Sequence, residues 1–214
     1  PSLREIVEIA HRATGLTKQL LTFAKGGAPI KKHATLIGLI KDTTDFVLSG
    51  SKIKAHYQME DRLWTVRVDE GQISQVIHNL VINAKQAMPN GGIIKICAEN
   101  VEIKPGNKLK PGRYVKLTVN DQGIGISKDI MNKIFAPFFT TKNKGNGLGL
   151  ATAFSIMHQH DGEIEVESQV GRGSSFKLYL PATELKAAQV DALRETATTR
   201  AEGRILFMDD EAGI

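Results

Sequence analysis

The chain has 214 residues, 41% of them hydrophobic and 24% charged, which is the composition of an ordinary globular protein rather than a disordered one. Its net charge of +5 does not indicate nucleic-acid binding, because the basic residues are mostly scattered and no aromatic residues interleave them. No apolar run approaches the 18 or so residues of a membrane span and no signal peptide opens the sequence, so we expect a cytoplasmic segment without direct membrane contact.

Residues 1–27 are predicted to form one long helix. Apolar or small residues recur at alternating steps of four and three between Leu3 and Ala24, which is the spacing of a coiled-coil seam. A glycine pair and then Pro29 end the helix. A lone helix cannot bury so broad an apolar stripe, so we expect it to pack in a helical hairpin or against a dimer partner.

A short strand near Thr35 and a helix over 36–48 follow. Two segments in which apolar and polar residues alternate, 53–59 and 64–68, are predicted to be antiparallel strands. Asp69 is the predicted N-cap of the next helix. The apolar face of that helix consists of Ile73, Val76, Ile77, Leu80, Val81, Ala84 and Met88.

The opposite face of this helix carries amides, where a surface helix usually carries Lys and Glu. They recur at steps of three and four, at Gln72, Gln75, Asn79, Asn83 and Gln86. Side chains at this spacing share one face and are able to line a cleft. We therefore interpret the stripe as part of a ligand site, with an ordinary solvated face as the alternative.

Strands are predicted near 93–103 and 114–120, with a loop rich in Lys, Pro and Gly between them. Cys97 has no second cysteine with which to form a disulfide or a thiolate metal site, so we expect a small core residue. Asp121 follows the second strand, and Gly123 and Gly125 come directly after it. Burying a carboxylate at a strand end costs free energy unless a hydrogen-bond donor contacts it. We therefore expect a group of a ligand to donate to Asp121.

After a short helix predicted to start at Ser127, the segment from Phe135 to Lys142 combines aromatic residues with Thr140, Thr141 and a lysine, which provide hydroxyls and a cation for phosphates. We expect this segment to be a lid that nucleotide orders.

The next glycines, Gly145, Gly147 and Gly149, lead into a predicted helix over 148–160. The N–H groups at its N-terminus, where Leu148 lies, favour a triphosphate. The Lys-Ser/Thr pair of a P-loop does not follow these glycines, so that nucleotide-binding fold is excluded.

Two closing strands over 163–168 and 174–180 complete the pattern. Strands and helices in this order predict an α+β fold, a two-layer α/β sandwich over residues 28–183. Residues 184–203 are predicted to be a helical or flexible connector. Residues 204–214 form a short apolar strand ending in acidic residues, which resembles the start of a response-regulator receiver domain; an unrelated tail is the alternative.

Taken in order, the amide helix, the Asp121 loop, the Phe135 segment and the Gly145 loop resemble the N, G1, F and G2 boxes of the ATP-binding domain of sensor histidine kinases. The resemblance spans about residues 36–181. It implies the Bergerat-type fold, with ATP and Mg²⁺ as cofactors. It also implies that residues 1–27 are the second helix of a dimerisation hairpin, in a parent protein that is itself cytoplasmic or membrane-anchored.

The same resemblance implies roles for individual residues. Asn83 ligates Mg²⁺ while Asn79 helps to hold phosphate or metal, and these two with Lys142 form the expected catalytic set. Asp121 accepts the adenine amine. The expected nucleotide-contacting residues are Asn83, Gln86, Asp121, Gly123, Gly125, Thr140, Thr141, Lys142, Gly145, Gly147, Leu148 and Gly149.

The residue at position 79 bears on whether the γ-phosphate is transferred to water or to another nucleophile. Related ATPases of the gyrase, heat-shock and mismatch-repair type carry a glutamate there that activates water, whereas Asn79 cannot act as a base. Glu70 lies too near the helix start to replace it. Transfer of the γ-phosphate to another nucleophile is therefore favoured over efficient hydrolysis.

The six histidines do not match the acceptor pattern of the family, in which Asp or Glu follows the histidine. His11 lies on what resembles the second hairpin helix. We expect the acceptor to precede residue 1, so that this fragment binds Mg-ATP without phosphorylating itself. The expected partners are the acceptor helix of the same protein, a receiver domain, and a second copy in a homodimer. The alternatives are an ATPase of the same fold and a non-catalytic nucleotide-binding or dimerisation module.

Overall fold

The computed structural model describes residues 28–106, 109–142 and 145–183. The helix predicted at 1–27 and the segments 184–203 and 204–214 lie outside the described residues. Lys144, which follows the predicted lid, also lies outside them.

One layer of the domain is a five-stranded sheet in the order β2-β4-β5-β7-β6. Its strands are β2 (Ile53–Met59), β4 (Gly92–Ile103), β5 (Gly112–Asp121), β6 (Glu163–Gln169) and β7 (Gly173–Pro181). Neighbours are antiparallel except β2, which runs parallel to β4. A smaller antiparallel sheet pairs β1 (Lys32–Ala34) with β3 (Val66–Val68).

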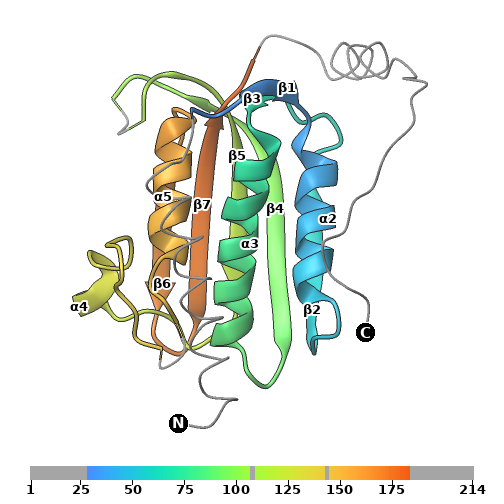
Figure 1. The fold of residues 1–214 in the computed structure, drawn as a ribbon. Coiled ribbons are helices and arrows are strands. Elements are labelled where there is room, and N and C mark those ends of the chain that lie inside the picture. Colours follow the sequence, from blue (N-terminus) through green and yellow to red (C-terminus); the bar gives the residue numbers. More distant parts are fainter. Residues whose placement is uncertain (1–27, 107–108, 143–144, 184–214) are drawn as a thin grey trace, which may run out of the picture.

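Helices α2 (Leu36–Leu48), α3 (Glu70–Ala87) and α5 (Gly149–Gln159) cover one face of the large sheet, with α3 in the middle (Figure 1). A fourth helix, α4 (Lys128–Met131), is a single turn beside them. The predicted two-layer α/β sandwich is confirmed. In the described part of the chain, no helix combines the length and apolar character needed to cross a membrane.

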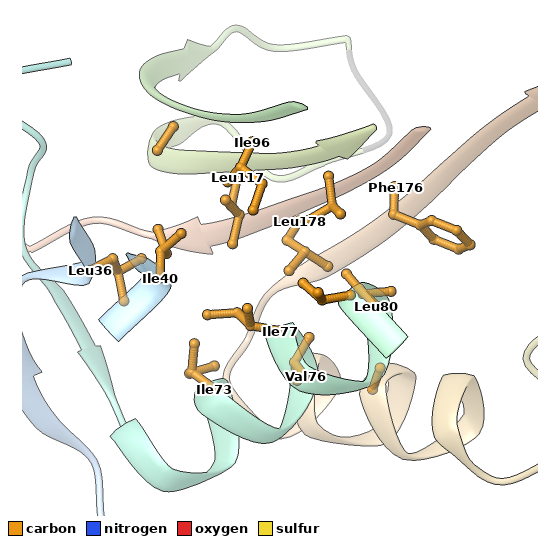
Figure 2. Close-up of a cluster of buried hydrophobic side chains, with 14 of the residues drawn as sticks. Leu36, Ile40, Ile73, Val76, Ile77, Leu80, Ile96, Leu117, Phe176 and Leu178 are labelled. Carbon is orange, nitrogen blue, oxygen red and sulfur yellow. The ribbon is translucent and has the colours of Figure 1, made fainter. Parts of the chain in front are cut away.

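The core lies between α3 and the sheet. Every third or fourth residue of α3 is apolar and buried, and these side chains face inward-pointing residues of the central strands (Figure 2). The predicted apolar face is confirmed in full, because all of its seven residues are buried. Each of the buried Ile, Val and Leu side chains contributes roughly 1.5–3 kcal/mol on burial. This packing fixes the rotation of α3 and so directs its amide stripe away from the sheet.

The expected antiparallel pairing of segments 53–59 and 64–68 is wrong. β2 pairs with β4 and β3 pairs with β1. Between β2 and β4 the chain passes through α3, and a crossover of this length returns the chain to the same end of the sheet, which makes the two strands parallel. The alternation of apolar and polar residues identified both strands but not their partners.

The prediction that Cys97 is a core residue is also wrong. Ile94, Ile96 and Ala98 of β4 are buried against the helices. Because side chains alternate between faces along a strand, Cys97 lies on the outward face, where it is partly buried.

Candidate functional site

Helix α3 positions the amide stripe. Asp69 begins the helix as predicted, since its Oδ1 accepts a hydrogen bond from the Gln72 backbone N–H at 3.1 Å. Ten residues further along, Asn79 Nδ2 donates to the Gly149 carbonyl at 3.0 Å. This bond ties the middle of α3 to the first residue of α5.

Lys142 from the predicted lid reaches the same stripe. Its Nζ donates to Asn83 Oδ1 at 2.9 Å and to Gln86 Oε1 at 2.6 Å. Burial lowers the pKa of Lys142, and the nearby Asp121 carboxylate acts in the opposite direction. The last turns of α3 therefore already hold a cation between two amide oxygens.

Asp121 is the last residue of β5, and only 4% of its surface is exposed. Its Oδ1 accepts the N–H of Gly123 at 2.8 Å and the N–H of Ser174 at 3.3 Å. Burial raises the pKa of Asp121, whereas these two N–H groups and the charge of Lys142 lower it. Within the described residues both bonds fall on Oδ1, which leaves Oδ2 to accept a bond from a ligand.

The glycines after Asp121 allow the loop to lie against the end of α3. A Cβ on Gly123 would stand 2.5 Å from the Cβ of Ala87 and 2.8 Å from its carbonyl oxygen, so no larger residue fits. The Ile124 N–H donates to the same carbonyl at 3.3 Å. Gly125 lies directly against the backbone of Gln169, the last residue of β6. The Asp121 carboxylate and the end of the amide stripe are therefore held by one packed junction.

The lid segment is braced by the second glycine loop. Gly147 has φ +65°, and a Cβ there would stand 2.7 Å from the Phe139 carbonyl oxygen. The Thr140 hydroxyl is used locally, since its oxygen accepts the Lys142 N–H at 3.1 Å, and a Cβ on Gly145 would stand 2.9 Å from it. Thr141 is exposed. Of the three predicted phosphate-binding side chains at 140–142, only Lys142 contacts the amide stripe.

Helix α5 starts beside this loop. Leu148 is its N-cap, is 2% exposed and makes no side-chain cap hydrogen bond. The first helical hydrogen bond runs from Thr152 N–H to the Leu148 carbonyl at 2.8 Å. The N–H groups of residues 149–151 therefore have no acceptor inside the helix, and such N–H groups favour anions.

Sequence reasoning missed the contribution of the first residues of β7. Gly173 packs directly on the Asp121 carbonyl, and Ser174 supplies one of the two N–H groups that hold the Asp121 side chain. The sequence feature that could have indicated this contribution is the run Gly171-Arg-Gly-Ser, where the chain turns from β6 into β7. Gly171 and Gly173 in this run both have positive φ.

Comparison with known proteins now identifies the family. The model for "Histidine kinase-, DNA gyrase B-, and HSP90-like ATPase" matches residues 68–184, which is more than half of the 214-residue chain. The chain belongs to this family. The matched range contains the whole candidate site, from the amide stripe of α3 to the β6–β7 turn.

Its curated relatives are sensor kinases. Sensor kinase CckA of Brucella abortus (strain 2308) is 34% identical over 238 aligned residues, covering 100% of this chain and 24% of CckA. Sensor histidine kinase ZraS of Escherichia coli (strain K12) is 35% identical over 175 residues, covering 80% of this chain and 36% of ZraS. The chain thus spans about a quarter to a little over a third of the length of these relatives.

Solved structures of histidine kinases share the fold. The catalytic domain of histidine kinase ThkA has a TM-score of 0.59 at 30% identity, covering 72% of this chain and 96% of that one. Full-length ShkA in complex with AMPPNP has a TM-score of 0.68 at 26% identity, covering 84% of this chain and 38% of ShkA. The expected histidine kinase catalytic fold is confirmed.

Proposed function

We propose that this chain is the ATP-binding catalytic domain of a sensor histidine kinase, which transfers the γ-phosphate of ATP to a histidine on a separate helix of the full-length protein. One observation carries the proposal. A buried carboxylate at the end of β5 and an amide stripe that holds a cation meet at the same end of α3, beside the N-terminus of α5.

Asp121 is suited to recognise the adenine. Two backbone N–H groups fix its Oδ1, so the orientation of the carboxylate does not depend on the ligand. The remaining oxygen is an acceptor, and an exocyclic amine is a donor that would satisfy it. Gly123 and Gly125 let the loop after Asp121 pack against Ala87 and Gln169, which keeps the carboxylate in place.

The residues present also fit Mg²⁺. The ion prefers oxygen ligands and keeps several waters, so one or two protein contacts are enough. Asn83 and Gln86 offer two amide oxygens that already surround the Lys142 ammonium. Among the described residues no group of three or more His, Cys, Asp or Glu side chains could hold a metal ion. Bound Mg²⁺ would neutralise charge on the phosphates.

Asn79 supports transfer to a supplied nucleophile rather than to water. Its amide cannot take a proton from water, and its Nδ2 is engaged with the Gly149 carbonyl. Glu70 lies nine residues earlier on α3, about 13 Å along the helix axis, and is therefore no replacement. The phosphate would be oriented by Lys142 and by the N-terminus of α5.

The remaining steps belong to the full-length protein. The phosphate would pass from the acceptor histidine to a receiver-domain aspartate, and two copies would associate through the hairpin that the 1–27 sequence predicts, in the cytoplasm. Two observations support this assignment. The curated relatives are named as sensor kinases, and the match to CckA extends over both the 1–27 and the 184–214 segments.

A transfer assay tests the proposal. The chain is incubated with γ-labelled Mg-ATP, with and without the acceptor hairpin of the full-length protein. The expected result is acid-labile, base-stable label on the hairpin, none on the chain alone, and loss of transfer in Asn83→Ala. Asp61→Asn, which changes an exposed side chain, should transfer normally. Label on His11 of the chain alone, or free phosphate as the main product, would contradict the proposal.

A further inference from the structure

The polar atoms of Asp69 join three parts of the domain. Its Oδ1 accepts the Gln72 N–H and caps α3, at 3.1 Å, while its Oδ2 accepts the Ile30 N–H at 3.0 Å. Its own backbone N–H donates to Nε2 of His160 at 3.0 Å. The entering chain, the start of α3 and the end of α5 therefore meet at one residue.

Neighbouring contacts reinforce the junction. His160 is 2% exposed, and its Nδ1 donates to the Ile156 carbonyl at 2.8 Å, which leaves Nε2 as the acceptor for Asp69. One residue after Ile30, the Lys31 ammonium forms an ion pair with Asp161 at 2.9 Å. The Asp161 side chain is 81% exposed, so this pair adds little stability by itself.

The second oxygen distinguishes Asp69 from an ordinary helix cap. A cap needs one side-chain oxygen, and serine or asparagine serves as well as aspartate. Oδ2 instead holds a backbone N–H that lies 39 residues earlier in the chain and belongs to an exposed residue, Ile30. Only the bond from Oδ1 to the Gln72 N–H caps α3.

We propose that Asp69 is a positioning residue, which fixes the chain entering the domain to α3 so that this segment and the nucleotide site keep one relative orientation. Asp69 is the N-cap of α3, whereas the site residues Asn79, Asn83 and Gln86 lie about 15 to 26 Å further along the helix axis. The entering chain follows directly from the helix predicted at 1–27. The inference rests on the proposed function, because orientation matters only if phosphate is handed to a separate helix.

The test uses variants that separate the cap from the tether in the full-length protein. Asp69→Ser and Asp69→Asn each retain a capping oxygen but lose the carboxylate oxygen that accepts the Ile30 N–H. We expect the Kd for Mg-ATP to stay within about twofold and the autophosphorylation rate at saturating Mg-ATP to fall about tenfold. Asp42→Asn, the same change on an exposed residue of α2, is the matched control and should alter neither.

Amide hydrogen exchange gives a readout that does not depend on activity. The Ile30 amide should exchange faster in both variants, while the amides of the first turns of α3 remain as protected as in the wild type. A normal phosphorylation rate with faster Ile30 exchange would overturn the positioning role. Unchanged Ile30 exchange would overturn the tether itself. Failure of the wild type to bind Mg-ATP would instead refute the proposed function, and exchange would still decide whether the tether exists.

Discussion

At the scale of the residue, Asp121 combines a cost in stability with an expected role in binding. Burial raises its pKa, so ionisation is less favourable in the folded state than in the unfolded state, and the ionised carboxylate lowers stability at neutral pH. Asp121→Asn removes the buried charge but keeps an oxygen for the N–H groups of Gly123 and Ser174. We expect Tm at pH 7 to rise by roughly 2–5 °C. Mg-ATP binding should be lost, because an amide NH₂ replaces the acceptor.

Thermal unfolding and calorimetry on the same preparation check this prediction, with Asp61→Asn as the control for a carboxyl-to-amide change on an exposed residue. Retained Mg-ATP binding would remove Asp121 from the site. A lower Tm in Asp121→Asn would show that the hydrogen bonds to Asp121 and the charge of Lys142 outweigh the cost of burying its carboxylate. The sequence identified Asp121 as a costly buried carboxylate, but the Ser174 donor lies 53 residues away and only the fold brings it there.

At the scale of the element, the bond from Asn79 to Gly149 couples α3 to α5. Asn79→Asp removes the donor and places a carboxylate oxygen opposite a carbonyl oxygen. We expect the free energy of unfolding to fall by about 1–3 kcal/mol. Mg-ATP affinity should fall as well, because the N-terminus of α5 loses its anchor. Denaturant titration and calorimetry measure the two effects, and Asn90→Asp in the exposed turn after α3 is the control. Unchanged stability and affinity would contradict this coupling.

Gly123 tests the junction between the Asp121 loop and α3. In Gly123→Ala the added methyl group would collide with the Ala87 Cβ and carbonyl, which belong to a helix that cannot easily move. We expect a loss of about 1–3 kcal/mol in denaturant titration, the usual cost of overpacking. Gly38→Ala is the control for the added methyl group, because nothing lies within 4 Å of a Cβ at that position; inside α2 it should raise stability by about 0.5–1 kcal/mol. Equal stability of the two variants would show that the loop is able to move away from α3.

The sequence predicted helices and strands correctly where a regular hydrophobic pattern extends over many residues. The seven-residue apolar face of α3 has a period near 3.6, and packing against the sheet preserved it. The pairing of β2 and β3 was not predictable, because alternation defines a strand but not its neighbour. The sequence also did not indicate that the hydroxyl oxygen of Thr140, an expected phosphate ligand, accepts a bond from the Lys142 backbone. This hydrogen bond forms because the chain turns between Thr140 and Lys142.

At the scale of the whole molecule, His160 makes stability depend on pH. Burial lowers its pKa below the ordinary 6.5, an effect that Lys31 reinforces and the Ile156 carbonyl, Asp69 and Asp161 oppose. The unfolded state therefore takes up a proton first as the pH falls. Stability contributed by neutral His160 is complete above about pH 6.5 and decreases below it.

We expect Tm to fall between about pH 7 and pH 5 in the wild type, and to fall less in His160→Gln. His158→Gln, an exposed neighbour, should behave as the wild type. Parallel pH profiles for the wild type and His160→Gln would exclude His160 as the cause.

Calorimetric titration of the chain with Mg-ATP, with released phosphate assayed in the same samples, tests the central claim most directly. The wild type should bind, Asp121→Asn and Asn83→Ala should lose binding, and phosphate release should be negligible because Asn79 offers no base. Absence of binding in the wild type would contradict a nucleotide site at this end of α3. Binding with sustained phosphate release would contradict the kinase assignment and favour a hydrolysing ATPase of the same fold.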